Sequence, residues 1–389
     1  MSGVYVHVPF CRRRCIYCDF YTVGERLAVW SDYVSAVLAE ARERLHPWMR
    51  AGIDTIYIGG GTPSLLPEAE FRRLAEGLLE LTGNVTEFTV EVNPDDVTPG
   101  LASVWRESGV NRVSMGVQSL VDAELRVIGR RHDGRRAREA YEVLRRGFDN
   151  VSLDLMFGLP RQTLESLRKS VEGIIAMSPE HVSVYSLMYE ERTALTRLRD
   201  EGRLAEQSEQ ASADMFRMLS EMLAGAGYEQ YEISNYAKPG FRSRHNSAYW
   251  QGVHYIGLGP GAHSYDGDRL RTANLPDLRA YLNYWGKGVG ELPAESEMLS
   301  NDELREEMIM TRLRTREGLD LAEFSRRFGE SETHRLLRDS HRWLAAGLLT
   351  LVLPDSSLSA LPKQFPTEGR LALTRNGIMI SDEIFASLF

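Results

Sequence analysis

Three cysteines lie close together near the start of the chain, and the sequence contains no others. Cys11, Cys15 and Cys18 follow a C-x₃-C-x₂-C spacing, directly after the apolar run 4–8. Three thiolates at this spacing suit a [4Fe–4S] cluster, which ordinarily takes four cysteines. Because the chain has no fourth cysteine, one iron of such a cluster stays open to a small molecule that can receive an electron.

Zinc, a disulfide and a chance arrangement are the alternatives to a cluster. Structural zinc ordinarily takes four protein ligands, so His7, on a predicted strand upstream, would have to complete a Cys₃His set. A disulfide would leave one cysteine unpaired, and nothing in the sequence suggests secretion. We therefore favour the cluster.

The composition of the chain limits its size class, its partners and its compartment. With 389 residues, 43% of them hydrophobic, it is long for one ordinary domain and predicts two or three units. A formal net charge of -9 argues against non-specific binding to nucleic acid. No apolar run is long enough to span a bilayer, and a strand is predicted at once, with no signal peptide before it. Free thiols in such a chain predict the reducing cytoplasm.

The first two thirds of the chain alternate predicted strands and helices. Strands are predicted at 4–8, 55–58, 88–92, 112–117, 151–156 and 181–187. Helices are predicted between them at 27–45, 67–81, 101–108, 135–146 and 164–177. This alternation predicts an α/β fold built of βαβ units around a parallel sheet. Six units are too few for a closed eight-fold barrel, so we expect an open (β/α)₆ partial barrel.

Polar residues and glycines follow the C-terminal ends of these strands, where α/β barrels gather their functional groups. The cysteines follow the first strand, and glycines at 59–61 follow the second. These glycines suit a tight turn or a close approach of backbone to a ligand. Glu91 and Asp154 are acids on otherwise apolar strands, which suits a core ion pair or contact with a ligand. Gln118 and Arg130 suit loop caps equally well.

A second distinctive segment, His-Asn-Ser-Ala-Tyr-Trp, occupies 245–250. A histidine among aromatic residues is more often a packed structural residue than a ligand. An exposed imidazole at His245, beside Tyr249 and Trp250, also suits haem, whose iron takes histidine and whose macrocycle packs on flat rings. His254 and His263 lie close by and are alternative ligands.

The remainder of the chain has a different pattern. A helix at 208–227 precedes a predicted strand and loop at 228–237. After residue 296, helices are predicted at 302–314, 320–328 and 331–346, with strands at 348–353 and 370–373 around a loop rich in Pro and Ser. Three helices and a β-ribbon are similar to a winged-helix module. Its helices lack an evident basic face, so we expect it to pack over the mouth of the barrel.

The cysteine motif, with the aromatic Tyr17 before its last cysteine, resembles the signature of the radical S-adenosylmethionine (SAM) proteins. In that family the amino and carboxylate groups of SAM hold the fourth iron, and the fold is a partial (β/α)₆ barrel. The resemblance implies a SAM-binding shell formed by Tyr5, Tyr17, Gly60, Gly61, Thr62, Glu91, Gln118, Arg130 and Asp154.

A narrower resemblance covers nearly the whole chain. The motifs at 5–10, 59–64, 91–94, 116–119, 154–160, 245–250 and 257–263 resemble, in this order, the haem-chaperone branch of the oxygen-independent coproporphyrinogen oxidase family. The resemblance implies binding of a cluster, SAM and haem, with haem near His245, Tyr249 and Trp250, and delivery to haem proteins. The alternative is the enzyme of that family, which oxidatively decarboxylates coproporphyrinogen III in porphyrin biosynthesis.

Three features favour the chaperone branch. Phe20 stands where the enzyme carries a further cysteine, the His-Asn-x-x-Tyr-Trp segment is intact, and the first strand begins by Val4 without a long extension. No catalytic residue can be assigned.

We expect a partial barrel at 1–235, a connecting segment at 236–295 and a C-terminal module at 296–389. The resemblance implies an electron donor such as a flavodoxin or ferredoxin, and leaves open a homodimer and contact with a membrane surface. Arg12, Arg13 and Arg14 suit a solvated loop, haem propionates or an acidic reductant.

Overall fold

The computed structural model describes residues 2–25, 29–46, 52–353 and 368–389. The predicted start of the first helix at residue 27 and the loop rich in Pro and Ser after residue 353 lie outside these ranges. None of the described helices is both long and apolar enough to cross a membrane.

All six predicted strands form, and they lie side by side and parallel within one twelve-stranded sheet. Their order in the sheet is their order in the chain, as expected when each βα unit adds the next strand. These strands are β1 (Gly3–Val8), β4 (Thr55–Gly60), β5 (Glu87–Val92), β6 (Arg112–Gln118), β7 (Val151–Phe157) and β8 (His181–Ser186).

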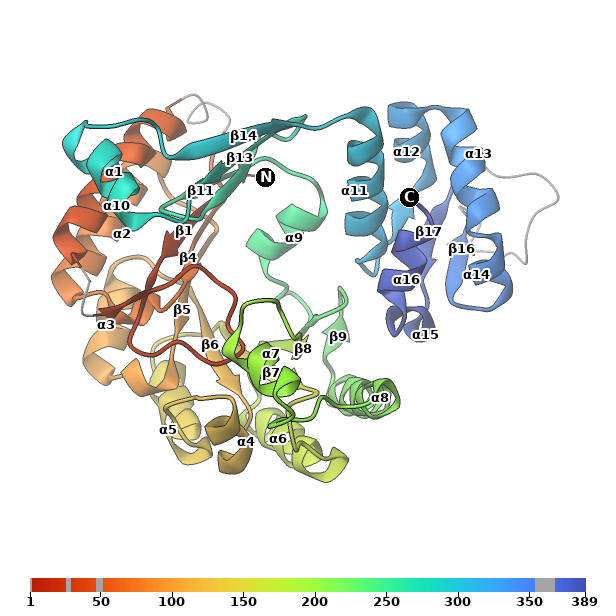
Figure 1. Cartoon of the computed structure of the whole chain (residues 1–389), viewed down its shortest axis with the longest axis horizontal. Helices are drawn as coiled ribbons and strands as arrows, with labels where there is room; N and C mark the ends of the chain where they lie inside the picture. Colours follow the sequence, from red (N-terminus) through yellow and green to blue (C-terminus); the bar gives the residue numbers. More distant parts are fainter. Residues whose placement is uncertain (1, 26–28, 47–51, 354–367) are drawn as a thin grey trace.

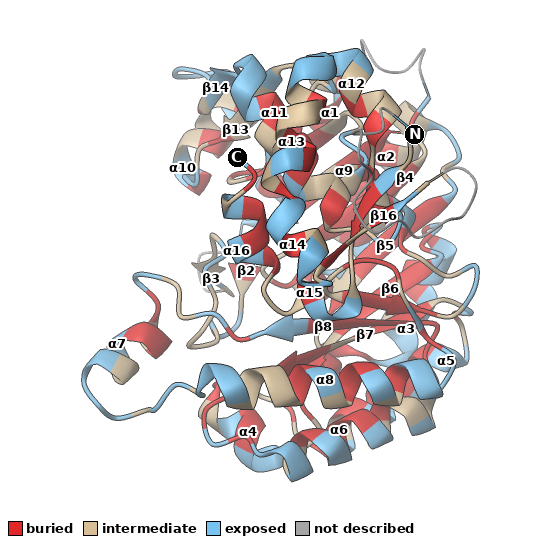
Figure 2. Ribbon diagram, turned by 90° about the vertical axis from the view of Figure 1, so that its right-hand side faces the viewer, coloured by how far each residue is buried: buried red, intermediate tan, exposed pale blue. Residues whose placement is uncertain are grey.

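Helices cover the outer face of these strands (Figure 1). They are α1 (Trp30–Leu45), α2 (Glu68–Thr82), α3 (Pro99–Glu107), α4 (Asp122–Val127), α5 (Gly134–Arg145), α6 (Leu164–Met177) and α8 (Glu209–Gly225). The short helix α7 (Ala194–Asp200) lies apart from this layer, beside the loop that follows β1 (Figure 2). The side chains of Thr98, Asp133 and Thr163 cap α3, α5 and α6 by accepting from backbone N–H groups. Figure 2 shows the amphipathic result on α6 and α8, where buried and exposed residues occupy opposite faces.

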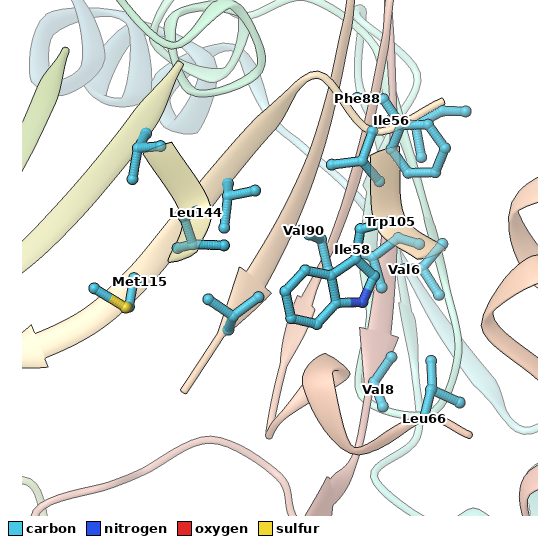
Figure 3. Packing of buried hydrophobic residues seen from close by; sticks show 14 of the residues in the cluster. Val6, Val8, Ile56, Ile58, Leu66, Phe88, Val90, Trp105, Met115 and Leu144 are labelled. Carbon is cyan, nitrogen blue, oxygen red and sulfur yellow. The ribbon is translucent and has the colours of Figure 1, made fainter. Parts of the chain in front are cut away.

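The core lies between the helices and the sheet. Figure 3 shows strand residues Val6, Ile58 and Val90 in one cluster with Trp105 of α3, which is 1% exposed. Strands buried on both faces carry near-continuous apolar runs, which explains why the sequence pattern located them.

Six further strands extend the sheet at both edges. On the β8 side, β10 (Asn235–Ala237) pairs antiparallel with β8 and with β9 (Glu229–Gln230), where the sequence predicts a single strand. On the β1 side, β11 (Tyr255–Leu258) runs parallel to β1. Antiparallel pairing then adds β12 (His263–Tyr265), β13 (Leu270–Asn274) and β14 (Ala294–Met298). The segment expected to be a connection therefore supplies part of the sheet.

Two helical stretches also belong to this segment. They are α9 (Arg244–Trp250) and α10 (Leu278–Tyr281), which continues into η4 (Leu282–Gly286). In Figure 1, α9 lies between the sheet and the C-terminal module.

The C-terminal module has its own apolar core, which includes Leu313, Phe324, Leu337 and Leu371. Its helices are α11 (Asn301–Leu313), α12 (Leu321–Phe328), α13 (Glu330–Asp339), α14 (His341–Ala345), α15 (Arg375–Ile378) and α16 (Ser381–Ala386). The predicted helix 331–346 is in fact two helices, α13 and α14, which meet at Ser340.

The ribbon of this module also differs from the prediction. It has three strands, because β15 (Leu319–Asp320) joins β17 (Arg370–Leu373) and β16 (Leu349–Val352).

Candidate functional site

The three cysteines lie on one loop that leaves the C-terminal end of β1. Cys11 ends β2 (Phe10–Cys11), which pairs with β3 (Val23–Gly24) and closes the base of the loop. Its middle is anchored by Ile16, whose N–H donates to Ile128 O at 3.3 Å and whose carbonyl accepts from Leu195 at 2.8 Å. Each cysteine is a free, partly exposed thiol, so all three thiols lie on one loop at this end of the sheet.

Polar groups from the loops that follow β4 and α4 contact two of these thiols. Cys11 Sγ lies 3.1 Å from Thr62 Oγ1, and Arg130 donates to Cys15 Sγ at 3.6 Å. Burial raises the pKa of the Cys11 and Cys18 thiols. Nearby cations favour thiolates, which are the form that binds metal.

His7, which would have to complete a Cys₃His set in the zinc alternative, is engaged elsewhere. Its Nε2 lies 2.9 Å from Tyr21 O and its Nδ1 lies 3.1 Å from the Tyr5 hydroxyl. Among the residues that the structure describes, no three His, Cys, Asp or Glu side chains are close enough to hold a single metal ion. A cluster does not need that closeness, because each thiolate binds a different iron.

The glycines at the end of β4 are required by close packing. Gly60 has φ +109°, and a Cβ at this position would lie 2.7 Å from His7 Nδ1. A Cβ at Gly61 would lie 2.8 Å from Phe10 O, in the backbone that leads into Cys11. The glycines therefore bring the end of β4 against the cysteine loop, as the sequence interpretation requires.

Glu91 lies beside this glycine loop, at the end of β5. Its carboxylate accepts from the Tyr57 hydroxyl at 2.8 Å and from Gly60 N–H at 3.1 Å. Burial raises the pKa of Glu91 to about 7, and Asp154 adds to the rise, although the two hydrogen bonds oppose it. A cationic ligand would favour the ionised carboxylate here.

Asp154 is the second carboxylate of the site, on β7. Burial raises its pKa to about 6, against the lowering effects of Ser183, Arg112 and Ser114. The Ser114 hydroxyl donates to its Oδ1 at 3.2 Å. Both acids predicted to contact a ligand therefore share one region, and neither has an ion pair within salt-bridge distance among the described residues.

Gln118 and Arg130 carry polar atoms that lack partners. Gln118 lies at a β-bulge between β6 and β7 with φ +65°, and its buried Oε1 accepts no hydrogen bond from a described residue. Arg130 donates to Asn93 Oδ1 at 3.1 Å and to Gly116 O, while its buried Nε has no partner in the described part of the chain. Strained backbone and unsatisfied buried atoms are features of ligand sites.

Tyr5 and Tyr17, the other two expected members of the SAM shell, lie apart from each other. Tyr5 lines a cavity beside Glu91, whereas Tyr17 packs near Ile128 and Leu159 on the side of the cysteine loop. Sequence analysis missed Tyr57 and Asn93, which hold Glu91 and Arg130. Tyr57 lies on β4 and Asn93 follows β5, at the same end of the sheet, and these positions were the signal in the sequence that could have identified both residues.

A cavity of about 1040 Å³ lies between this end of the sheet and the C-terminal module. Aromatic rings from several elements line it, together with Leu304 and Met308 of α11; these rings are Tyr5, Phe20, Tyr21, Tyr57, Tyr185, Tyr249, Trp250, Tyr255 and Tyr265. Glu91 reaches the same cavity, so the candidate SAM region and this aromatic space are continuous.

His245 borders the cavity, but the expectation of an exposed imidazole is wrong. It is 2% exposed, its Nδ1 lies 2.8 Å from Thr55 Oγ1, and its Nε2 lies 2.9 Å from the Tyr249 hydroxyl. Its ring also stacks on Tyr57 at a centroid distance of 5.0 Å. Burial lowers the pKa of His245 to about 3, so the ring is neutral.

Glu87, at the start of β5, explains this burial. Its carboxylate accepts from the backbone N–H groups of Arg244 at 2.9 Å and His245 at 3.0 Å, and from the Ser243 hydroxyl at 3.3 Å. An acid is favoured at a helix N-terminus, so Glu87 fixes the first turn of α9 against the sheet. This acid was not recognised in the sequence.

Trp250 joins the sheet to the C-terminal module. Arg314 lies over its ring with a Cζ-to-centroid distance of 4.5 Å, and Arg312 donates to its carbonyl at 3.4 Å. Tyr249 packs edge-on against Tyr255 at 4.5 Å. The segment 245–250 thus has the packing role that the sequence left open as an alternative to haem binding.

The other two candidate histidines differ in their surroundings. His263, on β12, is exposed and lines the cavity, and its ring makes no hydrogen bond with a described residue. His254 is partly buried, and burial lowers its pKa. The structure thus makes His263 the accessible imidazole of the three.

Comparison with known proteins places this geometry in a family. The radical SAM superfamily model matches residues 5–174, and the HemN C-terminal domain model matches residues 299–352. The heme chaperone HemW of Bacillus subtilis (strain 168) is 34% identical over 391 residues, covering 100% of this chain and 99% of that protein. The heme chaperone HemW of Mycobacterium tuberculosis (strain H37Rv) is 34% identical, covering 99% and 94%.

A solved structure supports the fold. Coproporphyrinogen III oxidase (HemN) from Escherichia coli superposes with a TM-score of 0.82 at 22% identity, covering 100% of this chain and 89% of that chain. The predicted α/β fold, a radical SAM fold with a C-terminal module, is confirmed. The chain belongs to the HemW family of radical SAM proteins.

Proposed function

We propose that this protein is a haem chaperone, which binds a [4Fe–4S] cluster, SAM and haem and delivers haem to haem proteins. The observation that carries this proposal is the aromatic cavity, which extends from Glu91 to α9 and α11. Two relatives that match nearly the whole chain are named heme chaperones, which supports the same function.

Cys11, Cys15 and Cys18 would hold the cluster, and the fourth iron would take SAM. The unpartnered Gln118 Oε1 and the two carboxylates with raised pKa values fit a ligand that carries both hydrogen-bond donors and positive charge. The cluster, when bound, supplies single electrons to SAM. Thr62 and Arg130 would orient the thiolates, and Glu91 and Asp154 would bind the cationic and hydroxyl groups of SAM.

Haem would occupy the aromatic cavity. A macrocycle needs flat apolar neighbours and its iron needs a donor such as imidazole. Tyr249 and Trp250 border this space, which supports the predicted role of the segment 245–250. Because both ring nitrogens of His245 are engaged, axial ligation by His245 requires its hydrogen bonds to Thr55 and Tyr249 to rearrange, whereas His263 needs no such change.

The enzymatic alternative, oxidation of coproporphyrinogen III, is less well supported. Phe20 takes the position of the enzyme's further cysteine; its side chain is 65% exposed and lines the cavity. A phenyl ring provides neither a thiol nor a hydrogen-bond donor at that point, which favours transport over decarboxylation.

The partners follow from this function. We propose recipient haem proteins, a cytoplasmic location and an electron donor such as a flavodoxin or ferredoxin. The exposed residues Arg12, Arg13 and Arg14 lie within the cysteine loop, between Cys11 and Cys15, and suit an acidic donor. The absence of nucleic-acid binding, the homodimer and the membrane contact stay predictions.

Haem titration tests the proposed site. We expect the wild-type protein to bind haem, and His263→Ala to change the absorbance spectrum and lower the affinity about tenfold or more, because it removes an iron donor. His245→Ala and His254→Ala serve as parallel variants, with circular dichroism to confirm folding. A folded His245→Ala protein with unaltered affinity and spectrum excludes His245 as ligand. Unaltered binding in all three variants places the iron ligand elsewhere, and absence of haem binding by the wild type contradicts the chaperone proposal.

A further inference from the structure

We propose that Arg327, assisted by Arg271, binds the propionate carboxylates of haem at the end of the cavity formed by β13 and α12. This inference rests on the proposed function, because it assigns an orientation to the ligand of that same cavity.

Four arginines line the cavity, and three of them already pair with carboxylates; the four are Arg271, Arg312, Arg314 and Arg327. Arg314 donates to Glu232 at 2.7 Å, and that glutamate side chain is completely buried. Arg312 pairs with Glu323 at 3.0 Å. These two residues therefore have little capacity left for a further anion.

Arg327, on α12, is the exception. Its side chain is exposed and lines the cavity, and it forms no ion pair with any residue in the described part of the chain. Its guanidinium lies over Phe328 at 5.5 Å. Its positive charge also opposes the rise that burial causes in the pKa of Tyr265. A planar guanidinium held among aromatic rings, with no carboxylate partner, is suited to bidentate binding of an incoming carboxylate.

Arg271 offers a second donor on the adjoining wall. It pairs with Glu307 at 2.7 Å, but its Nε is buried and has no hydrogen-bond partner among the described residues. Its guanidinium lies 5.8 Å from the centroid of the Tyr265 ring. Arg271 and Arg327 thus approach the same tyrosine, from β13 and from the C-terminal module. At this end of the cavity, Arg327 provides a cation without an ion pair to a described residue, and Arg271 provides an Nε–H without a described hydrogen-bond partner.

Haem has the matching chemistry, because both of its carboxylates lie on one edge of a flat apolar ring. With the propionates at Tyr265, the macrocycle extends toward the aromatic rings of Tyr249 and Tyr255. Glu295, which also lines the cavity and forms no ion pair with a described residue, would repel a carboxylate placed beside it. The same features therefore fix one orientation of the ring.

The test compares haem with haem dimethyl ester, whose carboxylates are blocked, in one detergent-containing buffer. We expect Arg327→Gln to weaken haem binding about tenfold and to leave the affinity for the ester unchanged, because the lost bonds are charge-assisted. Arg327→Lys should give an intermediate affinity. Arg326→Gln is the matched control, since Arg326 is exposed on the same helix but does not line the cavity.

The outcomes separate this inference from the proposed function. If wild-type protein binds haem but Arg327→Gln binds it equally well, or if the variant weakens haem and ester alike, the propionate assignment is wrong. If wild-type protein binds neither porphyrin, the proposed function itself fails. An equal loss in Arg326→Gln would show a general effect of surface charge and would also overturn the assignment.

Discussion

Cys15→Ala should remove most of the iron from anaerobically reconstituted protein. The wild-type protein, reconstituted in the same way, should hold about four irons and four sulfides per chain. The same loss is expected in Cys11→Ala and Cys18→Ala. The three thiols share one loop, and no other described side chains are grouped closely enough to bind a metal ion in their place. Iron and sulfide assays, with the visible absorbance of the cluster, make the measurement.

Arg13→Gln is the control for this experiment. Arg13 lies on the same loop and is exposed, but it is not a ligand, so its variant should keep the cluster. Tightly bound zinc without iron in the carefully prepared wild type would contradict the cluster assignment.

Glu91→Gln is expected to weaken SAM binding by about ten- to a hundredfold, the range for a lost hydrogen bond to a charged group. Glutamine cannot carry the negative charge that Glu91 offers to a cationic ligand. The two carboxylate oxygens of Glu91 accept hydrogen bonds from the Tyr57 hydroxyl and from Gly60 N–H, and glutamine has only one oxygen that can accept such a bond. Cluster content should not change, because Glu91 is not an iron ligand. Calorimetric titration of the reconstituted protein measures the affinity.

The pH dependence of SAM binding gives a second readout of Glu91. Its pKa before SAM binds is raised to about 7, so the carboxyl group is mostly protonated at pH 6 and mostly ionised at pH 8. Because a cation prefers the ionised form, wild-type affinity should increase between these pH values. Glu91→Gln should flatten that part of the profile, whereas Glu76→Gln, at an exposed position on α2, should behave as wild type. Unchanged SAM affinity in both Glu91→Gln and Asp154→Asn would remove these acids from the SAM shell.

The central sheet and its helices could be predicted because their signals are local. Strands such as β4 and β7 are buried on both faces, so they carry continuous apolar residues. Helices such as α3 and α6 have N-caps and end near glycine or proline. The grouping of Cys11, Glu91 and Asp154 followed from the parallel order of the strands.

The parts that could not be predicted depend on partners distant in sequence. Strand β12 is three residues long and contains His263 in place of a β-branched run, and it is stabilised by pairing with β11 and β13. The burial of His245 depends on Glu87, which is 158 residues away in the chain. A motif near aromatic residues could therefore identify the segment but could not reveal whether its imidazole is free.

The measurement that tests the account most directly follows two substrates in parallel. Anaerobically reconstituted wild-type protein is incubated with SAM and a one-electron reductant, and with either coproporphyrinogen III or haem plus an apo-haem protein. Chromatography of the porphyrins and the absorbance of the recipient record the products. We predict transfer of haem to the recipient and no protoporphyrinogen IX. Protoporphyrinogen IX formed over many turnovers, without haem transfer, would contradict the account.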